Sequence, residues 1–350
     1  MDLSFFIFLS SGLFLGWSLG ASDASNIFGT AVGTKMVKFN TAAIIASIFI
    51  IIGAVEAGDG ASQTLGELGS INTLAGAFMA ALAAALTIYW MVELSMPIST
   101  SQAIVGAIIG WNFFASKPTD IAVLSKIVTT WVVCPVLAGI IAVVLYRLTI
   151  KSVKYFHLHL LRQDCYIRSG LIFAGAFGAY ALGANNIANV MGVFVQSSPL
   201  KGITLPYVGV FNSTQVLFFI GALAISLGVA TYSKKVINTV GNGVMRMSPI
   251  MAWVVVVSQG LVLFLFASQE LQDFLYSYNL PAFPLVPVSS SQAVVGAVMG
   301  IGIYKGGRDI NWKLISKIAM SWVATPIIAA IICYVSLFFL QNVFALEVYK

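Results

Sequence analysis

The sequence predicts an all-α membrane protein with about ten transmembrane segments, arranged as two inverted five-segment repeats with interrupted helices. Of its 350 residues, 59% are hydrophobic and only 9% are charged, whereas soluble domains carry roughly 25% charged residues. Apolar runs of about 17–25 residues recur, which is the length that crosses a hydrocarbon core of roughly 30 Å. The third observation is internal duplication. We therefore read the net charge of +6 as a signal of membrane orientation and expect no nucleic-acid binding.

Three sequence blocks occur twice in the same order, which indicates a duplicated chain. "GASDASN" at 20–26 returns as "GANNIAN" at 183–189. "MPISTSQAIVGAIIG", starting at Met96, returns as "VPVSSSQAVVGAVMG", starting at Val286. "TDIAVLSKIVTTWVVCP" returns as "RDINWKLISKIAMSWVATP", with a Lys, a Trp and a Pro at the same spacing.

Counting the apolar segments gives five in each half, and an odd number inverts the second copy relative to the first. We expect residues 1–150 to form the first repeat, 151–167 a basic cytoplasmic connector, and 168–350 the second repeat, within one integral membrane domain. The expected spans are 3–20 (running on to 33), 40–57, 72–92, 97–115, 124–147, 169–184 (running on to 196), 208–230, 248–268, 284–304 and 315–342.

The distribution of basic residues predicts that both termini lie outside. Cytoplasmic loops of membrane proteins are enriched in Lys and Arg, and with the N-terminus outside, most of the 18 basic residues fall on the cytoplasmic side. A multi-pass protein of the plasma (cell inner) membrane is the expected localisation. The residues assigned inward are Lys35, Lys38, Arg147, Lys151, Lys154, Arg162, Arg168, Lys234, Lys235, Arg246, Lys305, Arg308, Lys313 and Lys317.

The second block predicts a site for an oxyanion. Pro97 and Pro287 cannot continue a preceding helix but fit the start of a new one. The following hydroxyls then lie in a first turn, where backbone N–H groups are free and the helix dipole is positive. Two such ends aimed at one point favour a phosphate- or sulfate-like anion. The predicted substrate-binding residues are Ser99, Thr100, Ser101, Gln102, Ser289, Ser290, Ser291, Gln292 and Asn185.

The first block predicts a site for a hard cation. Asp23 stands in an apolar context, and a charged side chain at bilayer depth costs at least about 2.5–3.5 kcal/mol, so such residues are functional candidates. Carboxylate, amide and hydroxyl oxygens suit Na⁺, and Gly20 and Gly183 are expected to let the backbone break. The predicted cation-binding residues are Asp23, Ser25, Asn26, Asn186 and Asn189; no other metal and no further cofactor is expected.

Together these two sites favour a secondary transporter, because bound cations and positive helix ends neutralise an anion in a low-dielectric site and thereby couple the two movements. Inverted repeats with broken helices are typical of such proteins, although fold alone does not establish function. The sequence has no Walker-type motif for ATP. An anion channel is the more distant alternative. An intramembrane enzyme would need a second acid or a nucleophile beside Asp23, so we expect no enzymatic activity.

The repeated blocks resemble those of the inorganic phosphate transporter (PiT) family, whose halves each begin with a GANDVANA-type motif and later carry a Pro-Ser-Thr-Thr-His-type segment. The resemblance covers essentially the whole chain. It implies cation-driven uptake of an inorganic oxyanion, usually phosphate with Na⁺ or H⁺, and often a homodimer. The matching positions are Gly20, Ala21, Asp23, Asn26, Pro97, Ser99, Thr100, Gly183, Ala184, Asn185, Ala188, Asn189, Pro287 and Ser289.

Four positions depart from the family pattern and bear on selectivity. Ser22 replaces an Asn, Asn186 replaces the second Asp, and Gln102 and Gln292 stand where His is common. Without those His residues a titrating imidazole cannot carry the proton there, which favours Na⁺ over H⁺ as the coupling ion. Phosphate carries an O–H that needs an acceptor, and Asp23 supplies one, so phosphate is the first expectation and sulfate the alternative.

Overall fold

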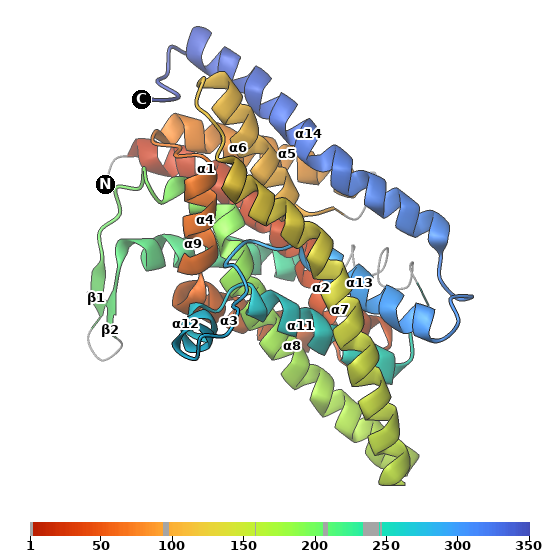
Figure 1. Ribbon diagram of the computed structural model, residues 1–350. Helices are drawn as coiled ribbons and strands as arrows, with labels where there is room; N and C mark the ends of the chain where they lie inside the picture. Colours follow the sequence, from red (N-terminus) through yellow and green to blue (C-terminus); the bar gives the residue numbers. More distant parts are fainter. Residues whose placement is uncertain (1–2, 94–97, 158, 206–208, 234–244, 246) are drawn as a thin grey trace.

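The computed structural model describes residues 3–93, 98–157, 159–205, 209–233, 245 and 247–350. The described chain is mostly helical, with one antiparallel hairpin that pairs Ile203 with Phe211 (Figure 1). The elements are α1 (Leu3–Ser22), α2 (Ala24–Gly33), α3 (Phe39–Ala57), α4 (Asp59–Leu68), α5 (Leu74–Glu93), α6 (Thr100–Phe114), α7 (Ile121–Tyr155), α8 (Leu160–Met191), a 3-10 turn (Gly192–Phe194), β1 (Ile203–Leu205), β2 (Gly209–Phe211), α9 (Ser213–Thr231), α11 (Pro249–Leu265), α12 (Gln269–Ser277), α13 (Ser290–Tyr304) and α14 (Trp312–Asn342).

Seven helical stretches of the described chain are long and apolar enough to cross a membrane: α1 with α2, α3, α5, α7, α8, α9 and α14. The pair α11 and α12, bent by 67°, would add an eighth. α6 and α13 have 15 residues each, and at 1.5 Å per residue such a helix reaches only about 22 Å, short of a bilayer core of roughly 30 Å. The all-α membrane architecture is confirmed, while the count of ten spans stays a prediction.

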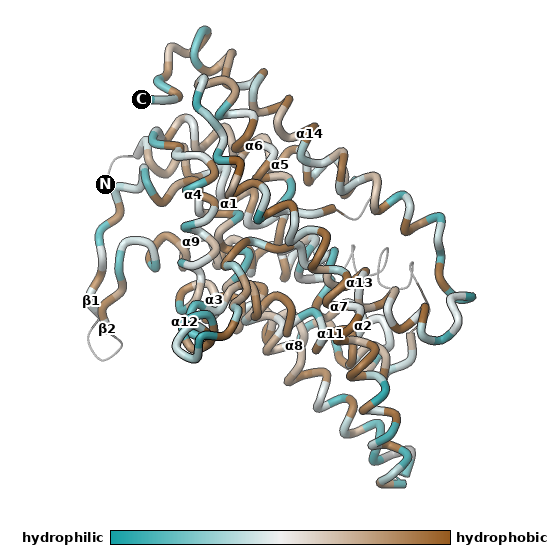
Figure 2. The backbone as a smooth tube through the Cα atoms, in the orientation of Figure 1, coloured by the Kyte–Doolittle hydropathy of each residue, from teal (hydrophilic) through white to brown (hydrophobic). Residues whose placement is uncertain are grey.

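Side chains on the outside of the bundle are apolar, as a lipid environment requires. Along α7, Val132, Val136, Ile140 and Val144 recur every fourth residue and are 50–65% exposed. Figure 2 shows brown, hydrophobic residues along much of α7, which crosses the front of the bundle, and of α14 at its edge. Burying this stripe in hydrocarbon removes apolar surface from water, which is the dominant stabilising term for such a face.

The first polar motif interrupts its helix at Asp23, between α1 and α2, but the interruption predicted at the second motif is wrong. α8 runs unbroken through residues 183–189. The glycines serve close packing instead of a break. A Cβ at Gly20 would collide with the carbonyl oxygen of Ile225 on α9, and a Cβ at Gly183 with that of Ile50 on α3. α1 therefore packs on α9 as closely as α8 packs on α3.

A second pair of matching crossings joins the halves at the other glycine positions. A Cβ at Gly106 on α6 would strike the carbonyl oxygen of Pro326 on α14, and a Cβ at Gly296 on α13 would strike that of Pro135 on α7. The short helix of each repeat block thus packs against the long proline-containing helix of the other half. Matching residues make matching contacts, so the duplication in sequence is also a duplication in packing.

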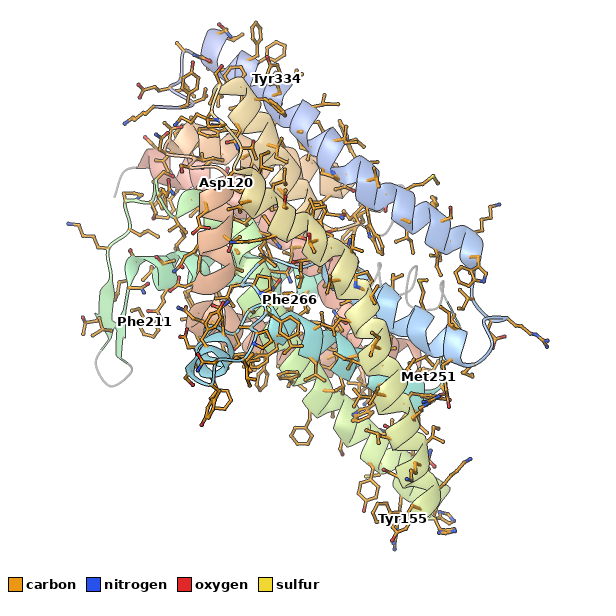
Figure 3. The ribbon with its side chains drawn as sticks, viewed as in Figure 1. Asp120, Tyr155, Phe211, Met251, Phe266 and Tyr334 are labelled. Carbon is orange, nitrogen blue, oxygen red and sulfur yellow. The ribbon has the colours of Figure 1, made fainter. Side chains whose placement is uncertain are left out.

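The chain ends lie together at one end of the molecule, and the α7–α8 turn lies at the opposite end (Figure 1). Lys117 Nζ donates to the Lys350 carbonyl oxygen at 3.0 Å, which ties the C-terminus to the loop after α6. Asp120 and Tyr155 mark the two ends of α7, and Tyr334 lies on α14 near the end that holds the C-terminus (Figure 3).

Two predicted boundaries differ from the structure. The connector expected at 151–167 is mostly helical, since α7 continues to Tyr155 and α8 begins at Leu160. The span expected at 208–230 begins at Ser213, because a capping box between Asn212 and Gln215 starts α9 there. In that arrangement each of the two side chains accepts a hydrogen bond from the other residue's backbone N–H, which satisfies two donors at the helix end.

A buried polar site where the two halves meet

α6 and α13 begin with the same serine cap, at the positions that the sequence predicts. Ser99 Oγ accepts a hydrogen bond from the Gln102 backbone N–H at 3.3 Å, and Ser289 Oγ accepts one from Gln292 at 3.3 Å. Serine is a preferred residue for this position because its oxygen satisfies one of the free N–H groups. Pro287 precedes the second cap, while Pro97 lies outside the described residues.

The hydroxyl groups of the two caps are arranged alike. Ser99 Oγ lies 3.0 Å from Ser101 Oγ, and Ser289 Oγ lies 2.9 Å from Ser291 Oγ. All four side chains are buried. Each helix end therefore presents free backbone N–H groups and a pair of hydroxyls at the positive end of its dipole.

The two helix ends adjoin each other. Ser291 Oγ, in the first turn of α13, donates to the Ile98 carbonyl oxygen at 2.8 Å, just before α6 begins. The partner atoms are 193 residues apart in sequence. Both positive helix ends consequently occupy one region in the interior of the bundle.

The segment around Asp23, at the break between α1 and α2, bonds both helix ends. Asp23 Oδ2 accepts a hydrogen bond from Thr100 Oγ1 of α6 at 2.9 Å. Asn26 Nδ2 of α2 donates to Ser290 Oγ of α13 at 3.3 Å. Asp23 is only 2% exposed. These two hydrogen bonds tie the segment to the first turns of α6 and α13.

No basic side chain neutralises Asp23 within the part of the chain that the structure describes. The ion pair found there joins Arg168 to Asp164 at 3.6 Å, both more than half exposed. A buried carboxylate is costly unless a charge or hydrogen bonds compensate it. The Thr100 hydroxyl and the positive ends of α6 and α13 supply part of that compensation.

Asn185 holds the segment that leads into α13. Its Oδ1 accepts from the Val288 backbone N–H at 2.7 Å, and its Nδ2 donates to the Val286 carbonyl oxygen at 2.9 Å. A third, longer contact of 3.4 Å reaches the Phe266 carbonyl oxygen. With both ends of the amide engaged by backbone, Asn185 positions the Ser289 cap. Its predicted direct contact with substrate stays a prediction.

Asn186 and Asn189 form a pair on α8. Asn189 Nδ2 donates to Asn186 Oδ1 at 2.8 Å, three residues apart on one helix face. The remaining polar atoms, Asn186 Nδ2 and Asn189 Oδ1, are buried without a hydrogen-bond partner among the described residues. No hydrogen bond in that part of the chain connects this pair directly to Asp23.

Unpaired polar atoms also line the first turns of α6 and α13. Gln102 Oε1 and Gln292 Oε1 are buried and have no partner among the described residues. Buried polar groups in proteins are paired in roughly 90% or more of cases, so a cluster of exceptions needs a cause such as a ligand, ion or water. The remaining predicted residue, Ser25 of α2, donates across the break at Asp23 to the Ser22 carbonyl oxygen at the end of α1.

Gln259 is a buried polar residue that the sequence motifs do not include. It lies on α11, is 1% exposed, and neither its Nε2 nor its Oε1 has a partner among the described residues. α11 packs on α2, which carries Asn26. In the sequence, a lone glutamine within the apolar run "VVVVSQGLVLFL" is the pattern from which this buried polar residue could have been predicted.

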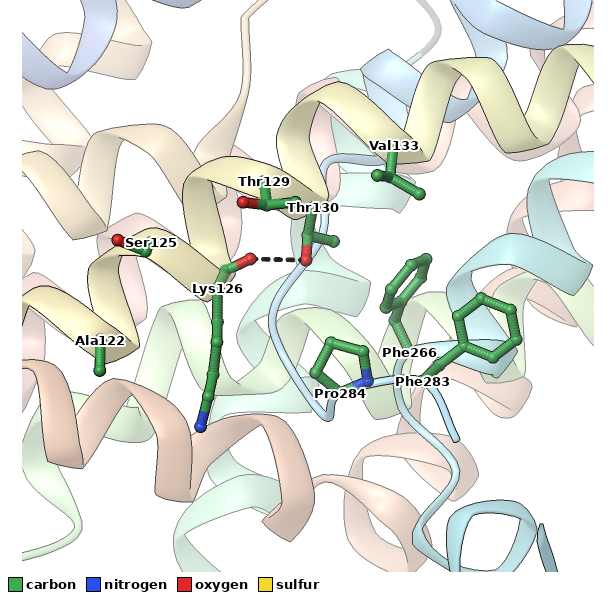
Figure 4. A pocket seen from close by; sticks show the side chains of 9 residues that line it. All are labelled: Ala122, Ser125, Lys126, Thr129, Thr130, Val133, Phe266, Phe283 and Pro284. Carbon is green, nitrogen blue, oxygen red and sulfur yellow. Dashed lines mark hydrogen bonds between the residues drawn. The ribbon is translucent and has the colours of Figure 1, made fainter. Parts of the chain in front are cut away.

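A pocket of about 380 Å³ opens beside the segment that Asn185 holds. Ser125, Lys126 and Thr129 of α7 line one wall, and Phe266 and Phe283 line the other. Figure 4 shows the Lys126 side chain extending away from α7, while the Thr130 hydroxyl bonds the Lys126 carbonyl oxygen at 2.8 Å. Phe266, which lines the pocket, also contacts Asn185 through its carbonyl oxygen. The pocket therefore adjoins the segment that Asn185 anchors.

Comparisons with known proteins find related sequences along most of the chain. The model of a family described as "Phosphate transporter family" matches twice, over residues 19–167 and 154–333. A protein of Methanocaldococcus jannaschii named "Putative phosphate permease" is 28% identical over 96% of this chain and 97% of its own length. One of Haemophilus influenzae with the same name is 26% identical over 95% of this chain and 96% of its own length.

A solved structure shares the fold. The protein described as "The sodium-dependent phosphate transporter" superposes with a TM-score of 0.75, covering 96% of this chain and 98% of its own, at 22% sequence identity. At that identity the likeness concerns the fold. Together with the seven membrane-crossing stretches, these matches show a multi-pass membrane protein.

Proposed function

Because the chain belongs to the phosphate transporter family, we propose that it is a secondary active symporter that imports inorganic phosphate across the plasma membrane, driven by a Na⁺ gradient. The observation that carries this proposal is the convergence of two serine-capped helix ends on the segment that holds Asp23 and Asn26. Anion-binding helix ends and an uncompensated carboxylate in one buried region form a site where an anion and a cation stabilise each other's binding.

Phosphate would bind between the first turns of α6 and α13. Free backbone N–H groups and the serine and threonine hydroxyls donate to its oxygens. An amide Nε2 from Gln102 and from Gln292 adds a neutral donor. Phosphate also carries an O–H at neutral pH, and Asp23 offers an acceptor for it. Sulfate, the alternative substrate, lacks this O–H, and the names of the matched relatives mention phosphate alone.

Sodium would bind through oxygens around Asp23 and on α8. Asp23 supplies the one carboxylate, and Asn26, Asn186, Asn189 and Ser25 supply amide and hydroxyl oxygens, of which Asn189 Oδ1 has no partner among the described residues. Hard cations prefer such oxygen ligands. The structural neighbour is described as sodium-dependent, which supports Na⁺ over H⁺ for this chain.

The arrangement in the membrane that we propose is two inverted repeats, residues 1–150 and 168–350, with both termini outside. The matched crossings of α1 with α9 and α8 with α3 support the repeat. Both chain ends lie opposite the α7–α8 turn, which supports placing the two termini on the same side of the membrane (Figure 1). A homodimer is carried over from the family resemblance as an expectation.

Uptake of radiolabelled anions into proteoliposomes tests the proposed function. Phosphate should accumulate when Na⁺ is imposed outside, and a pH gradient alone should drive little uptake. Sulfate should neither accumulate nor compete. Accumulation driven only by a pH gradient would overturn the sodium coupling, preferred uptake of sulfate would overturn the substrate, and uptake that never exceeds equilibrium would favour a channel.

Removing both serine caps should weaken phosphate binding. The double variant Ser99→Ala with Ser289→Ala loses two oxygens that organise the helix ends, each worth about 1 kcal/mol, so the KM for phosphate should rise roughly tenfold or more. Ser248→Ala is the matched control, because Ser248 caps α11 in the same way outside the site. An unchanged KM in the double variant would refute the helix-end site.

Replacing Lys126 should slow capture of phosphate from the outer side. Its side chain lines the pocket beside the anchored segment, and loss of one partly solvated charge is worth up to about 1 kcal/mol. Lys126→Gln should therefore raise the KM roughly 2- to 5-fold without changing the maximal rate, with a smaller effect at high salt. Lys317→Gln, at the matching position of the other repeat, is the control and should leave the KM for external phosphate unchanged.

A further inference from the structure

An apolar groove of about 700 Å³ runs between α7, α13 and α14, away from the buried polar site. Its walls are mostly aliphatic. Val136, Ile140 and Val144 of α7 and Ile303 of α13 line it and are 50–59% exposed. The Trp322 indole Nε1–H at its edge is buried and has no partner among the described residues.

A basic pocket of about 620 Å³ continues this groove at one end. Tyr304 lines both cavities, which makes them contiguous. The Arg147 guanidinium stacks over the Tyr304 ring at 4.7 Å from its centroid, and the Tyr146 ring meets the same ring edge-on at 6.1 Å. The aromatic pair therefore stands between an apolar cavity and a charged one.

The charges of the pocket face one cavity and lack acidic partners among the described residues. Arg147, Lys151 and Lys154 follow each other at helical spacing along one face of α7, and Lys305 joins them from the end of α13. Within the described chain none of these four forms an ion pair with a carboxylate. Enrichment of basic residues on the cytoplasmic side would account for the side of the membrane predicted for these residues, but not for their gathering around a cavity that adjoins an apolar groove at Tyr304.

We propose that the groove and the basic pocket together bind one anionic phospholipid, with an acyl chain in the groove and the phosphate headgroup in the pocket. Charge complementarity argues for this occupant, since basic pockets between membrane helices bind anionic headgroups. Arg147 offers a planar fork for phosphate oxygens, and the lysines act as point charges. Both volumes fall within the ~300–1,000 Å³ of small-molecule sites.

A bound lipid here would act on the transport site through α13. That helix lines the groove at Val295, Gly296 and Met299, and it begins at Ser290, which accepts a hydrogen bond from Asn26. A lipid that covers the crossing of α7 and α13 would hold α13 in the position seen here. We therefore expect phosphate uptake to rise with the anionic lipid content of the vesicle.

Native mass spectrometry of the full chain tests the proposal, with phosphatidylglycerol and phosphatidylcholine of equal acyl length as probes. The wild type should retain phosphatidylglycerol in preference to phosphatidylcholine. The triple variant Arg147→Gln, Lys151→Gln, Lys154→Gln should bind phosphatidylglycerol on the order of 100-fold more weakly. The control Arg308→Gln, Lys313→Gln, Lys317→Gln removes the same three charges from the same predicted side and should bind as the wild type does.

Two further arms distinguish the combined site from a headgroup-only contact and from a free-phosphate site. Val144→Trp fills the groove and keeps every charge, so it should also lose phosphatidylglycerol; retention would show a headgroup-only contact and overturn the combined site. Excess inorganic phosphate should not displace the lipid; displacement would identify a free-phosphate site instead. Equal retention of both lipids, or equal loss in the control triple, would overturn the proposal. A third result would also overturn it: a wild-type protein that is dimeric and binds no lipid, together with a Val144→Trp variant that is monomeric. In that case a second copy of the chain, and not a lipid, would cover the groove.

Discussion

Asp23→Asn is expected to abolish Na⁺-driven phosphate uptake while leaving the fold intact. The variant keeps the size of the side chain and an oxygen for the Thr100 hydroxyl, but it removes the one buried negative charge of the site. Hydrogen bonds and contacts to a charged group are worth about 1.5–3 kcal/mol, so Na⁺ affinity should fall roughly 10- to 150-fold. Uptake of radiolabelled phosphate under a Na⁺ gradient measures the loss.

Asp120→Asn is the matched control for this experiment. Asp120 caps α7 from an exposed position, where its Oδ1 accepts from the Ala122 and Val123 backbone N–H groups. Asparagine also caps helices well, so this variant removes the same charge without touching the site and should transport normally. Na⁺-dependent uptake at the wild-type rate in Asp23→Asn would remove Asp23 from the cation site.

Asn185→Ala should cause the second large loss, through the position of the α13 cap. Truncation leaves the Val288 N–H and the Val286 carbonyl oxygen buried without their partner, at about 1–3 kcal/mol for each unsatisfied group. The segment must then shift, and the fraction of molecules with a competent site falls with it. We expect phosphate affinity to drop by roughly 10- to 100-fold, measured by phosphate binding to the purified protein.

Two comparisons separate a positioning role from general destabilisation. Asn212→Ala removes the cap of α9 and should lower the melting temperature without changing phosphate affinity. Asn185→Asp keeps the acceptor for the Val288 N–H but loses the donor to Val286, so its affinity should lie between wild type and Asn185→Ala. If Asn185→Ala bound phosphate with wild-type affinity, the position of the anchored segment would not determine phosphate binding.

Much of the site was predictable because its residues stand out against hydrocarbon. Serines after a proline, and an aspartate in an apolar run, have few structural uses inside a membrane, so their types and positions point to helix caps and a cation ligand. Ser99, Ser289 and Asp23 accordingly lie in the meeting region. The duplication added the expectation that the two helix ends converge, and the bond from Ser291 to the Ile98 carbonyl oxygen shows that they adjoin.

Other features depend on contacts between distant segments and were not readable from sequence. Asn185 and Val288 are 103 residues apart, so the role of Asn185 as an anchor appears only in the fold. The break expected at Gly183 is absent, because this glycine serves the close packing of α8 on α3. Hydropathy likewise cannot separate a full span from a 15-residue helix that follows an extended segment, as at α13.

The two copies differ most where the first has a carboxylate and the second an amide. Asp23 bonds Thr100 and its neighbour Asn26 bonds Ser290, whereas Asn186 bonds Asn189 within α8. The charged copy thus contacts both helix ends, and the neutral copy pairs within its own helix. Asn186→Asp should add a second cation requirement, seen as a steeper dependence of phosphate uptake on Na⁺ concentration; an unchanged Na⁺ dependence would show that residue 186 lies outside the cation site.

Phosphate and Na⁺ are proposed to bind to one coupled site at the ends of α6 and α13. Calorimetric titration of phosphate into the purified protein, in Na⁺ and in choline at equal ionic strength, tests this directly. Coupled sites typically change each other's affinity about 5- to 150-fold, so phosphate should bind at least about tenfold more tightly in Na⁺, and Asp23→Asn should erase the difference. Equal affinity in the two buffers for the wild type would contradict the coupled site.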